Sequence, residues 1–514
     1  MRTPCHSFPN LRDAIDAGGT PPPGYLIGAE HRTALGDLLQ GSAIASGVEK
    51  LRGRSVLIAS ADPFLVALAL IEFDGLARRM TLYPPDLALE HLPYVLRNAE
   101  VDAVVSDGSF LSGASIGAAQ HAICTPALVP RVHASQERLP TEWILLTSGT
   151  TGRPKMVLHT LASLAGAIDA SASHNEAFAS SSRGARGVRT PLAPREDREV
   201  IWSTFYDMRR YGGLQIYLRA VLTRSSLLLT GPQELVANFL QRAGEAGVTH
   251  ISGTPSHWRR ALMSPAADRI APRYIRLSGE IVDQAILNSL RSVYPDAEIS
   301  HAFATTEAGV AFDVRDALSG FPASMLTGQN VGRISNPSEK QDGLEIRPTF
   351  LSGTSGVDLK VVDATLRVRS SRTAERYLGE NPPALKDPEG FVDTGDVLEL
   401  RDGRYHFQGR RDGVINVGGL KVHPEEVEAV LNRHPQVRLS LVKTKKNSIT
   451  GALVVADVLL NDPSTPEGEQ ARALQQTIMR FCRESLAPHK VPAAISFVPA
   501  LAISETGKLV RRHG

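Results

Sequence analysis

The chain has 514 residues, of which 42% are hydrophobic and 21% are charged, a composition typical of globular proteins with a sizeable core. A chain of this length is predicted to form more than one domain. The formal net charge of +2 gives no electrostatic reason to expect nucleic acid or an anionic membrane as a partner.

The first 130 residues alternate between strand-like and helix-like segments. Residues 55–60 are a short β-rich run, residues 63–78 are helical in character, and residues 101–106 are a second β-rich run. This alternation predicts parallel strands joined by crossover helices. The composition then changes, and residues 170–198 are rich in Ser, Ala, Arg and Pro, which predicts a surface loop.

The second half of the chain changes its pattern twice. Residues 214–229 are apolar at helical spacing and end in three leucines, which predicts a helix followed by a buried strand. Short alternating segments from about residue 343 predict a meander of strands. Pro424, followed by two glutamates, marks a helix start, and the last hundred residues predict a small α/β unit.

Cysteine usage and the apolar runs indicate the compartment. Cys5, Cys124 and Cys482 lie far apart without CxxC spacing, which argues against a disulfide framework or a zinc cluster and is typical of reduced thiols. No segment has the features of a signal peptide or is long enough to span a bilayer. We therefore expect a cytoplasmic protein without membrane insertion.

One nine-residue segment indicates a site for a polyphosphate. The predicted strand 143–146 leads into Thr147-Ser148-Gly149-Thr150-Thr151-Gly152-Arg153-Pro154-Lys155. Its two glycines let backbone N–H groups approach an anion, its four hydroxyl residues donate further hydrogen bonds, and Lys155 adds a positive charge. The spacing does not fit the Walker A pattern.

This segment resembles the phosphate-binding motif of the adenylate-forming superfamily of acyl- and aryl-CoA synthetases, peptide-synthetase adenylation domains and luciferases. Further motifs of that superfamily follow in order as far as residue 508. The resemblance implies an α/β fold with a large N-terminal domain of stacked α/β subdomains plus a distorted β-barrel, followed by a small mobile α/β C-terminal domain. We place the boundary after Arg411, giving domains 1–411 and 412–514.

The resemblance also implies roles for residues of the large domain. Residues 277–280 resemble the adenine-side turn, with Ser278, Gly279 and Glu280 near the nucleotide, and residues 301–309 resemble the motif N-x-Y-G-x-T-E. Phe303 would stack on adenine, Thr306 would bind the α-phosphate or the acid carboxylate, and Glu307 would hold Mg²⁺, which prefers oxygen ligands.

Further roles are implied toward the C-terminus. Asp396 would accept both ribose hydroxyls, Arg410 would contact ribose and phosphate, and Asp412 would be the hinge between the domains. Gly418, Gly419 and Lys421 would line the tunnel of the acceptor thiol. Lys508, in the segment Glu505-Thr506-Gly507-Lys508, would be the catalytic lysine.

The implied reaction uses ATP, Mg²⁺ and coenzyme A. A small-molecule carboxylate attacks the α-phosphate, pyrophosphate leaves, and a thiol then displaces AMP. Lys508, Lys155, the loop amides and Mg²⁺ stabilise the negative charge of the transition state. No general base is required, because a carboxylate is already ionised at neutral pH.

The acid itself stays open. The family's acyl-pocket segment carries a histidine before a glycine, whereas residues 205–213 have Arg209 and Arg210 in that neighbourhood. One hypothesis is that an arginine binds a second polar group of the acid, and the alternative is an exposed or structurally paired arginine. Other pocket-wall candidates are Phe205, Tyr206, Gly279, His301 and Ala302.

The acceptor and the activity have alternatives as well. A chain without an appended carrier domain favours coenzyme A, but it is also compatible with an enzyme that loads a separate carrier protein. A catalytically dead nucleotide-binding relative is a third hypothesis, against which the intact Lys155, Glu307, Asp396 and Lys508 argue.

Overall fold

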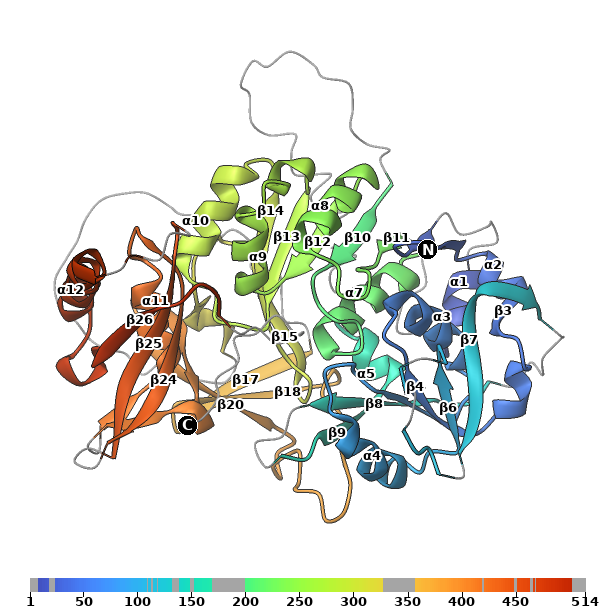
Figure 1. Cartoon of the computed structure of the whole chain (residues 1–514). Helices are drawn as coiled ribbons and strands as arrows, with labels where there is room; N and C mark the ends of the chain where they lie inside the picture. Colours follow the sequence, from blue (N-terminus) through green and yellow to red (C-terminus); the bar gives the residue numbers. More distant parts are fainter. Residues whose placement is uncertain are drawn as a thin grey trace, which may run out of the picture.

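The computed structural model describes residues 8–17, 24–108, 110–111, 114–117, 119–131, 138–147, 152–168, 199–326, 356–417, 420–447, 451–462, 466 and 468–501. Two eight-stranded sheets form most of the molecule (Figure 1). The first sheet has the order β19 (Arg376–Leu378), β9 (Lys155–Thr160), β8 (Glu142–Thr147), β5 (Arg79–Leu82), β4 (Ser55–Ala59), β6 (Ala103–Ser106), β7 (Gln120–Pro130) and β3 (Gly41–Ile44). Its strands from β8 to β7 are parallel, as the sequence predicts.

The second sheet has a parallel centre between antiparallel edges. Its order is β15 (Gly309–Val314), β14 (Glu298–Thr305), β13 (Tyr274–Ser278), β12 (His250–Gly253), β10 (Ile201–Thr204), β11 (Ser226–Leu228), β1 (Tyr25–Ile27) and β2 (Arg32–Ala34). The strands from β14 to β1 are parallel, so their carboxyl ends meet at one edge of the sheet.

Helices cover both sheets and fill the space between them. Between the sheets lie α1 (Leu11–Asp16), α3 (Pro63–Phe73), α5 (Leu161–Ala165) and α7 (Tyr211–Leu222), which share one apolar core with residues of both sheets. On the outer faces, α8 (Val236–Glu245), α9 (Pro255–Leu262) and α10 (Gln284–Val293) pack on the second sheet, and α4 (Leu92–Asn98) packs on the first. The short α2 (Asp37–Gln40) precedes β3.

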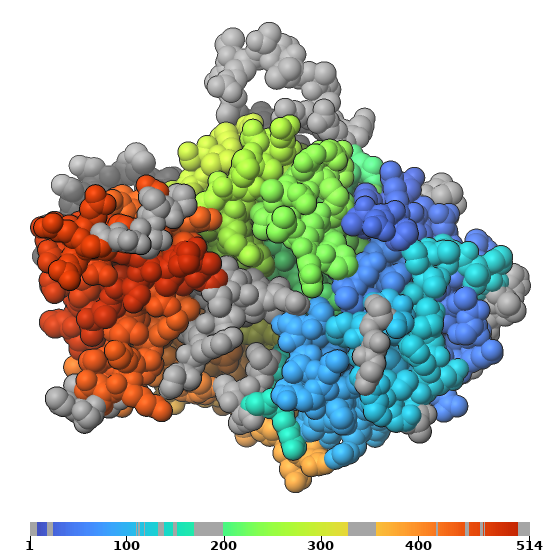
Figure 2. Space-filling model, in the orientation of Figure 1, coloured from blue at the N-terminus to red at the C-terminus, as the bar shows by residue number. Residues whose placement is uncertain are grey.

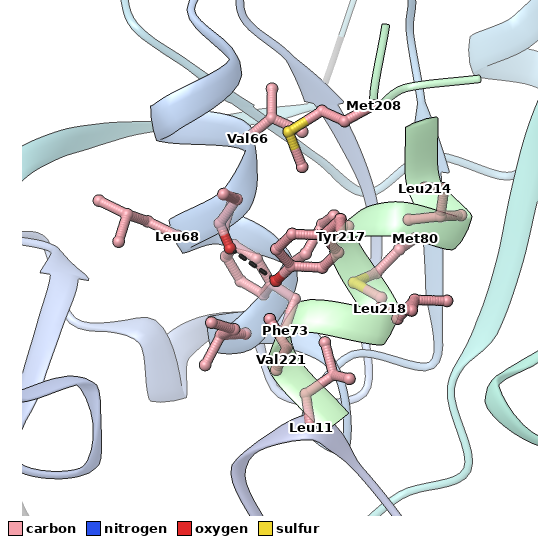
Figure 3. Packing of buried hydrophobic residues seen from close by; sticks show 14 of the residues in the cluster. Leu11, Val66, Leu68, Phe73, Met80, Met208, Leu214, Tyr217, Leu218 and Val221 are labelled. Atoms are coloured by element: carbon pink, nitrogen blue, oxygen red, sulfur yellow. Dashed lines mark hydrogen bonds between the residues drawn. The ribbon is translucent and has the colours of Figure 1, made fainter. Parts of the chain in front are cut away.

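The sequence of α3 explains its central position. Asp62 caps its first turn, Pro63 occupies the first helical position, and all 11 residues of the helix are buried. A helix whose residues are all apolar except Glu72 needs burial on every side, which two sheets provide. Figure 3 shows α7 packed against α3, and the Tyr217 hydroxyl donates to the carbonyl of Ala67 in α3 at 2.9 Å.

An antiparallel sheet and a smaller C-terminal unit follow. The antiparallel sheet has the order β16 (Phe321–Pro322), β21 (Arg404–Arg410), β20 (Val392–Arg401), β18 (Thr365–Ser370) and β17 (Val357–Val362). The predicted meander is therefore present, except that β19 leaves it and pairs with β9 of the first sheet. The predicted strand at residues 344–347 and the predicted loop at 170–198 lie outside the described residues.

The C-terminal unit contains the helices α11 (Pro424–Leu431) and α12 (Gly468–Ser485). Its strands are the hairpin β22 (Ile415–Val417) and β23 (Leu420–Val422), and the sheet β24 (Val437–Asn447), β25 (Gly451–Leu460) and β26 (Ala494–Phe497). Figure 2 shows these orange and red residues gathered at one end of the molecule. The boundary predicted after Arg411 falls in the 3₁₀ turn Arg411–Gly413, and no described sheet has strands on both sides of it.

A buried ion-pair cluster connects α3 to the edge of the first sheet. The Glu72 carboxylate is fully buried and accepts from Arg12 at 2.7 Å, from Arg131 at 3.0 Å and from the Ala43 amide at 3.0 Å. Burial lowers the pKa of Arg12 to about 10. Because two guanidinium groups share this carboxylate, removing its charge would take from the buried Arg12 the carboxylate it pairs with and leave Arg131 with the more distant Glu49, at 3.9 Å.

We predict that Glu72→Gln lowers the free energy of unfolding by about 3–5 kcal/mol, the usual cost of breaking a buried ion pair on one side. Chemical denaturation measures the change. The matched control is Glu100→Gln, because Glu100 is exposed, its partner Arg78 is exposed as well, and its buried partner Arg79 keeps an ion pair with Glu142 at 2.6 Å. We expect a change below about 1 kcal/mol. Equal effects of the two substitutions would contradict the structural role of Glu72.

Candidate active site

The carboxyl ends of the parallel strands of the second sheet bring several predicted residues together. Tyr206 follows β10, Gly279 and Glu280 follow β13, and Thr306 follows β14. The Tyr206 hydroxyl donates to the carbonyl of Ser278 at 2.6 Å, and the Glu280 carboxylate accepts from the amide of Ser256 at 2.9 Å. This edge of a parallel sheet is where α/β folds bind their ligands.

The predicted phosphate loop begins and ends on the first sheet. Thr147 closes β8 and Lys155 opens β9, and these two residues are direct partners in the antiparallel pairing. Gly152 has a φ of +88°, a conformation that favours glycine. Ser148, Gly149, Thr150 and Thr151 lie outside the described residues.

Tyrosine rings lie beside both basic side chains of this loop. The Lys155 ammonium is 5.6 Å from the centre of the Tyr377 ring, and the Arg153 guanidinium is 5.2 Å from that of Tyr94. Both distances are within the range of a cation–π interaction. No local pattern indicates either tyrosine, since both are distant in sequence and approach the loop only through α4 and β19.

The Thr306–Glu307 segment, although it belongs to the second sheet, is held by the first. The Nε2 atom of His159 in β9 lies 2.7 Å from the carbonyl oxygen of Thr306, and its Nδ1 atom lies 2.9 Å from the hydroxyl of Ser163. The amide of Ala374 donates to the carbonyl of Glu307 at 2.9 Å. These contacts fix the backbone of the predicted Thr306 and Glu307 sites.

Burial determines the protonation of His159. The ring is fully buried, and this desolvation lowers its pKa to about 4. The imidazole is therefore neutral at pH 7. Because a carbonyl oxygen can only accept, the proton belongs on Nε2, and Nδ1 accepts from Ser163.

Tyr377 contacts the predicted metal-binding carboxylate. Its hydroxyl donates to Oε1 of Glu307 at 3.2 Å, and burial raises the pKa of this phenol, so it stays a donor. Within the described part of the chain, Glu307 makes no ion pair, and no group of three His, Cys, Asp or Glu side chains could hold a metal by itself. A single carboxylate fits Mg²⁺, which takes its remaining ligands from substrate phosphates and water.

The predicted ribose-binding residues lie opposite one another. Asp396 in β20 and Arg410 in β21 are partners in the antiparallel pairing, which places their side chains on the same face. Arg410 also donates to the carbonyl of Thr394 at 3.3 Å. These two residues, 14 apart in sequence, are therefore neighbours in space.

Phe303, the predicted adenine platform, belongs to an aromatic cluster. Its ring lies 4.8 Å from that of Phe407 with an interplanar angle of 11°, and 5.6 Å from that of Phe312 at 21°. It stays partly exposed. The cluster joins β14 to the hairpin that carries Asp396 and Arg410.

Arg209 is engaged within the protein. It is 4% exposed, its Nε donates to Asp207 at 2.7 Å, and its Nη1 donates to the carbonyls of Ser60 and Ala61. This arrangement is the structurally paired alternative to binding an acid. Arg210 instead donates to the carbonyl of Leu146, directly before the phosphate loop, at 2.8 Å, and pairs with Asp86.

The other pocket-wall candidates are packed against protein. Phe205 makes an edge contact with Phe239 at 5.0 Å, and Ala302 is buried in β14. His301 is 8% exposed and bonds through Nε2 to the carbonyl of Leu318 at 2.9 Å, and burial lowers its pKa.

The C-terminal candidates are described only in part. Asp412 is exposed in the 3₁₀ turn at the predicted hinge, and Lys421 is exposed on β23. A Cβ atom on Gly409, just before this turn, would lie 2.3 Å from the carboxylate of Glu425, so the C-terminal unit approaches the hinge closely. Gly418, Gly419 and Lys508 lie outside the described residues.

Comparisons with known proteins cover most of the chain. Residues 77–365 match the family described as AMP-binding enzyme, and residues 426–508 match the AMP-binding enzyme C-terminal domain. The acetyl-coenzyme A synthetase of Novosphingobium aromaticivorans is 27% identical over 450 residues, which cover 83% of this chain and 63% of that protein. The acyl-CoA ligase ppsA of Aspergillus oryzae is 27% identical over 315 residues, covering 59% and 53%. The chain thus spans less than two thirds of each of these relatives.

Solved structures show the same fold. The anthranilate CoA ligase AuaEII, in complex with anthranoyl-AMP, superposes with a TM-score of 0.73 and 17% identity, covering 99% of this chain and 97% of that one. The o-succinylbenzoate coenzyme A synthetase of Bacillus subtilis, in complex with ATP and magnesium ion, superposes with a TM-score of 0.70 and 16% identity. The match covers 99% of this chain and 98% of that one. The predicted fold class is confirmed. No helix among the described residues is long and apolar enough to cross a membrane.

We predict that His159 makes stability depend on pH between about 6.5 and 4. In this range the unfolded state binds a proton at His159 that the folded state excludes. The contribution of His159 to the free energy of unfolding is therefore fully present above the range and is lost as the pH falls through it. Gln at this position keeps an N–H donor but does not titrate. Between pH 7.5 and pH 5, the unfolding free energy of wild type should fall roughly 2 kcal/mol more than that of His159→Gln.

Urea denaturation at the two pH values measures this difference. Identical pH dependence of the two proteins would show that His159 takes up its proton in the folded state without cost.

Proposed function

The chain belongs to the AMP-binding enzyme family, and from this membership we propose that it is an ATP-dependent ligase that joins a carboxylic acid to a thiol through an acyl-AMP intermediate. Coenzyme A is the proposed acceptor. The names of its relatives support this choice, since they include an acetyl-coenzyme A synthetase and an acyl-CoA ligase.

One observation carries the proposal. Lys155, at the end of the phosphate loop, and Glu307, on the other sheet, both contact Tyr377. A lysine at the end of a glycine-containing loop and a carboxylate beside the same tyrosine suit a nucleotide polyphosphate with its divalent cation. Asp396 and Arg410, paired across β20 and β21, are the proposed ribose contacts.

In the first half-reaction, a carboxylate oxygen attacks the α-phosphorus of ATP. The bond from that phosphorus to the bridging oxygen breaks, and pyrophosphate leaves. Lys155, the amides of the loop and Lys508 stabilise the negative charge on the phosphate oxygens, and Thr306 orients the α-phosphate or the acid. When bound, Mg²⁺ supplies a Lewis acid that neutralises phosphate charge, with Glu307 as its protein ligand.

In the second half-reaction, the thiol sulfur attacks the acyl carbon. The bond from that carbon to the AMP oxygen breaks, AMP leaves, and the thiol proton passes to solvent. We propose that the unit after Arg411 rotates about Asp412, so that Lys508 withdraws and Gly418, Gly419 and Lys421 approach the acyl-AMP. A hinge of this kind needs only a few residues that change their backbone angles.

We predict acid-dependent exchange of pyrophosphate into ATP, measured over a panel of alkyl, aryl and dicarboxylic acids with Mg²⁺. At least one acid should support exchange, and adding coenzyme A should convert that acid into its thioester with release of AMP. Exchange without an acid serves as the blank.

Two outcomes would redirect this proposal. If an acid supports exchange but forms a thioester only with a phosphopantetheine-bearing carrier protein, that carrier protein replaces coenzyme A as the proposed acceptor. If no acid of the panel supports exchange while the protein still binds the nucleotide, the result would indicate a nucleotide-binding protein without catalytic activity.

We predict that Lys508→Ala slows acyl-AMP formation by about 10²–10³, the typical effect of losing one group that stabilises transition-state charge. Thioester formation from supplied acyl-AMP should stay near wild type, because Lys508 has withdrawn in that step. Lys445→Ala, an exposed lysine of the same unit, is the matched control. Equal losses in both half-reactions would contradict the assigned role.

A further inference from the structure

Tyr377 joins the two sheets at the candidate site. It lies on β19, a strand of three residues, where its partner in β9 is Val157. Side chains alternate along a strand, so Tyr377 shares a face with Val157, and therefore with Lys155 and His159 on either side. Its hydroxyl donates to Glu307 at 3.2 Å, and its ring centre is 5.6 Å from the Lys155 ammonium.

The backbone and the carboxylate of Glu307 are fixed by different groups. The backbone is held by the hydrogen bonds of Ala374 to Glu307 and of His159 to Thr306. Among the described residues, the Tyr377 hydroxyl is the side-chain group that hydrogen-bonds the Glu307 carboxylate, through Oε1. The orientation of that carboxylate therefore depends on this phenol.

We propose that Tyr377 is a positioning residue, whose hydroxyl orients the Glu307 carboxylate for a divalent cation and whose ring holds Lys155 for the nucleotide phosphates. The inference rests on the proposed function. Fixing Oε1 leaves Oε2 to bind the metal. The negative face of the ring attracts the ammonium and restricts the flexible lysine side chain.

The two parts of Tyr377 make separate contributions. Phe at this position keeps the ring beside Lys155 and removes the hydroxyl, whereas Leu removes both. Hydrogen bonds that orient a metal-binding carboxylate are worth about 10–100-fold in metal affinity or activity. Loss of the ring should then weaken nucleotide binding by a further factor of about two to five.

The test measures the binding of Mn²⁺ in the presence of α,β-methylene-ATP. Binding is monitored through the electron paramagnetic resonance signal of free Mn²⁺. Tyr377→Phe should weaken Mn²⁺ binding about 10–100-fold, while its affinity for the nucleotide in EDTA stays near wild type. Tyr377→Leu should weaken Mn²⁺ binding and should also lower the affinity for the nucleotide in EDTA.

A double-mutant cycle with Glu307→Gln separates positioning from general damage. If the hydroxyl acts through Glu307, removing it from Glu307→Gln should have little further effect. The matched control is Tyr294→Phe, which removes a buried hydroxyl bonded to the carbonyl of Ala267 at 2.7 Å, remote from the loop. Its Mn²⁺ affinity should equal that of wild type.

The outcomes distinguish this inference from the proposed function. If wild type and Tyr377→Phe bind Mn²⁺ equally, or if the two substitutions act additively, Tyr377 has no positioning role and the proposed function is unaffected. If wild type binds neither the nucleotide nor Mn²⁺, both the positioning role of Tyr377 and the proposed function are wrong.

Discussion

The apolar layer between the two eight-stranded sheets is the constraint on which the rest of the structure depends. Its central helices, α3 and α7, are buried along nearly their whole length, and the core they share contains side chains from both sheets. Close packing of this layer fixes the separation and the angle of the sheets. Residues on different sheets can therefore form contacts at hydrogen-bond distances, which the candidate site requires.

Polar contacts near the strand ends complete this arrangement. The carbonyls of Ala61 and Leu146, on the first sheet, accept from Arg209 and Arg210 of the second, and the carbonyl of Thr306, on the second sheet, accepts from His159 of the first. Ala61 and Thr306 lie just beyond the ends of β4 and β14, and Leu146 lies one residue before the end of β8. Backbone carbonyls near a strand end lose ladder partners and need other donors when buried. The same contacts that satisfy these carbonyls hold the segments to which we assign phosphate and metal binding.

This arrangement changes how the arginines of residues 205–213 are interpreted. From sequence, an arginine where the family carries histidine suggests recognition of a second polar group on the acid. In the structure, the Arg209 guanidinium is committed to Asp207 and two carbonyls, and that of Arg210 to Asp86 and Leu146. Both side chains stabilise the junction of the sheets, and Arg210 does so directly before the phosphate loop.

The sequence by itself determined the fold class and the order of the chemical groups, because both are local. Strand and helix periods appear within a few residues, and Thr147–Lys155 and Thr306–Glu307 are continuous segments with recognisable chemistry. Only the tertiary structure decided that β19 leaves its meander to pair with β9, that His159 holds Thr306, and that Tyr377 lies between Lys155 and Glu307. These contacts join residues 70 to more than 200 positions apart, and their existence depends on the packing of a shared core that no local pattern records.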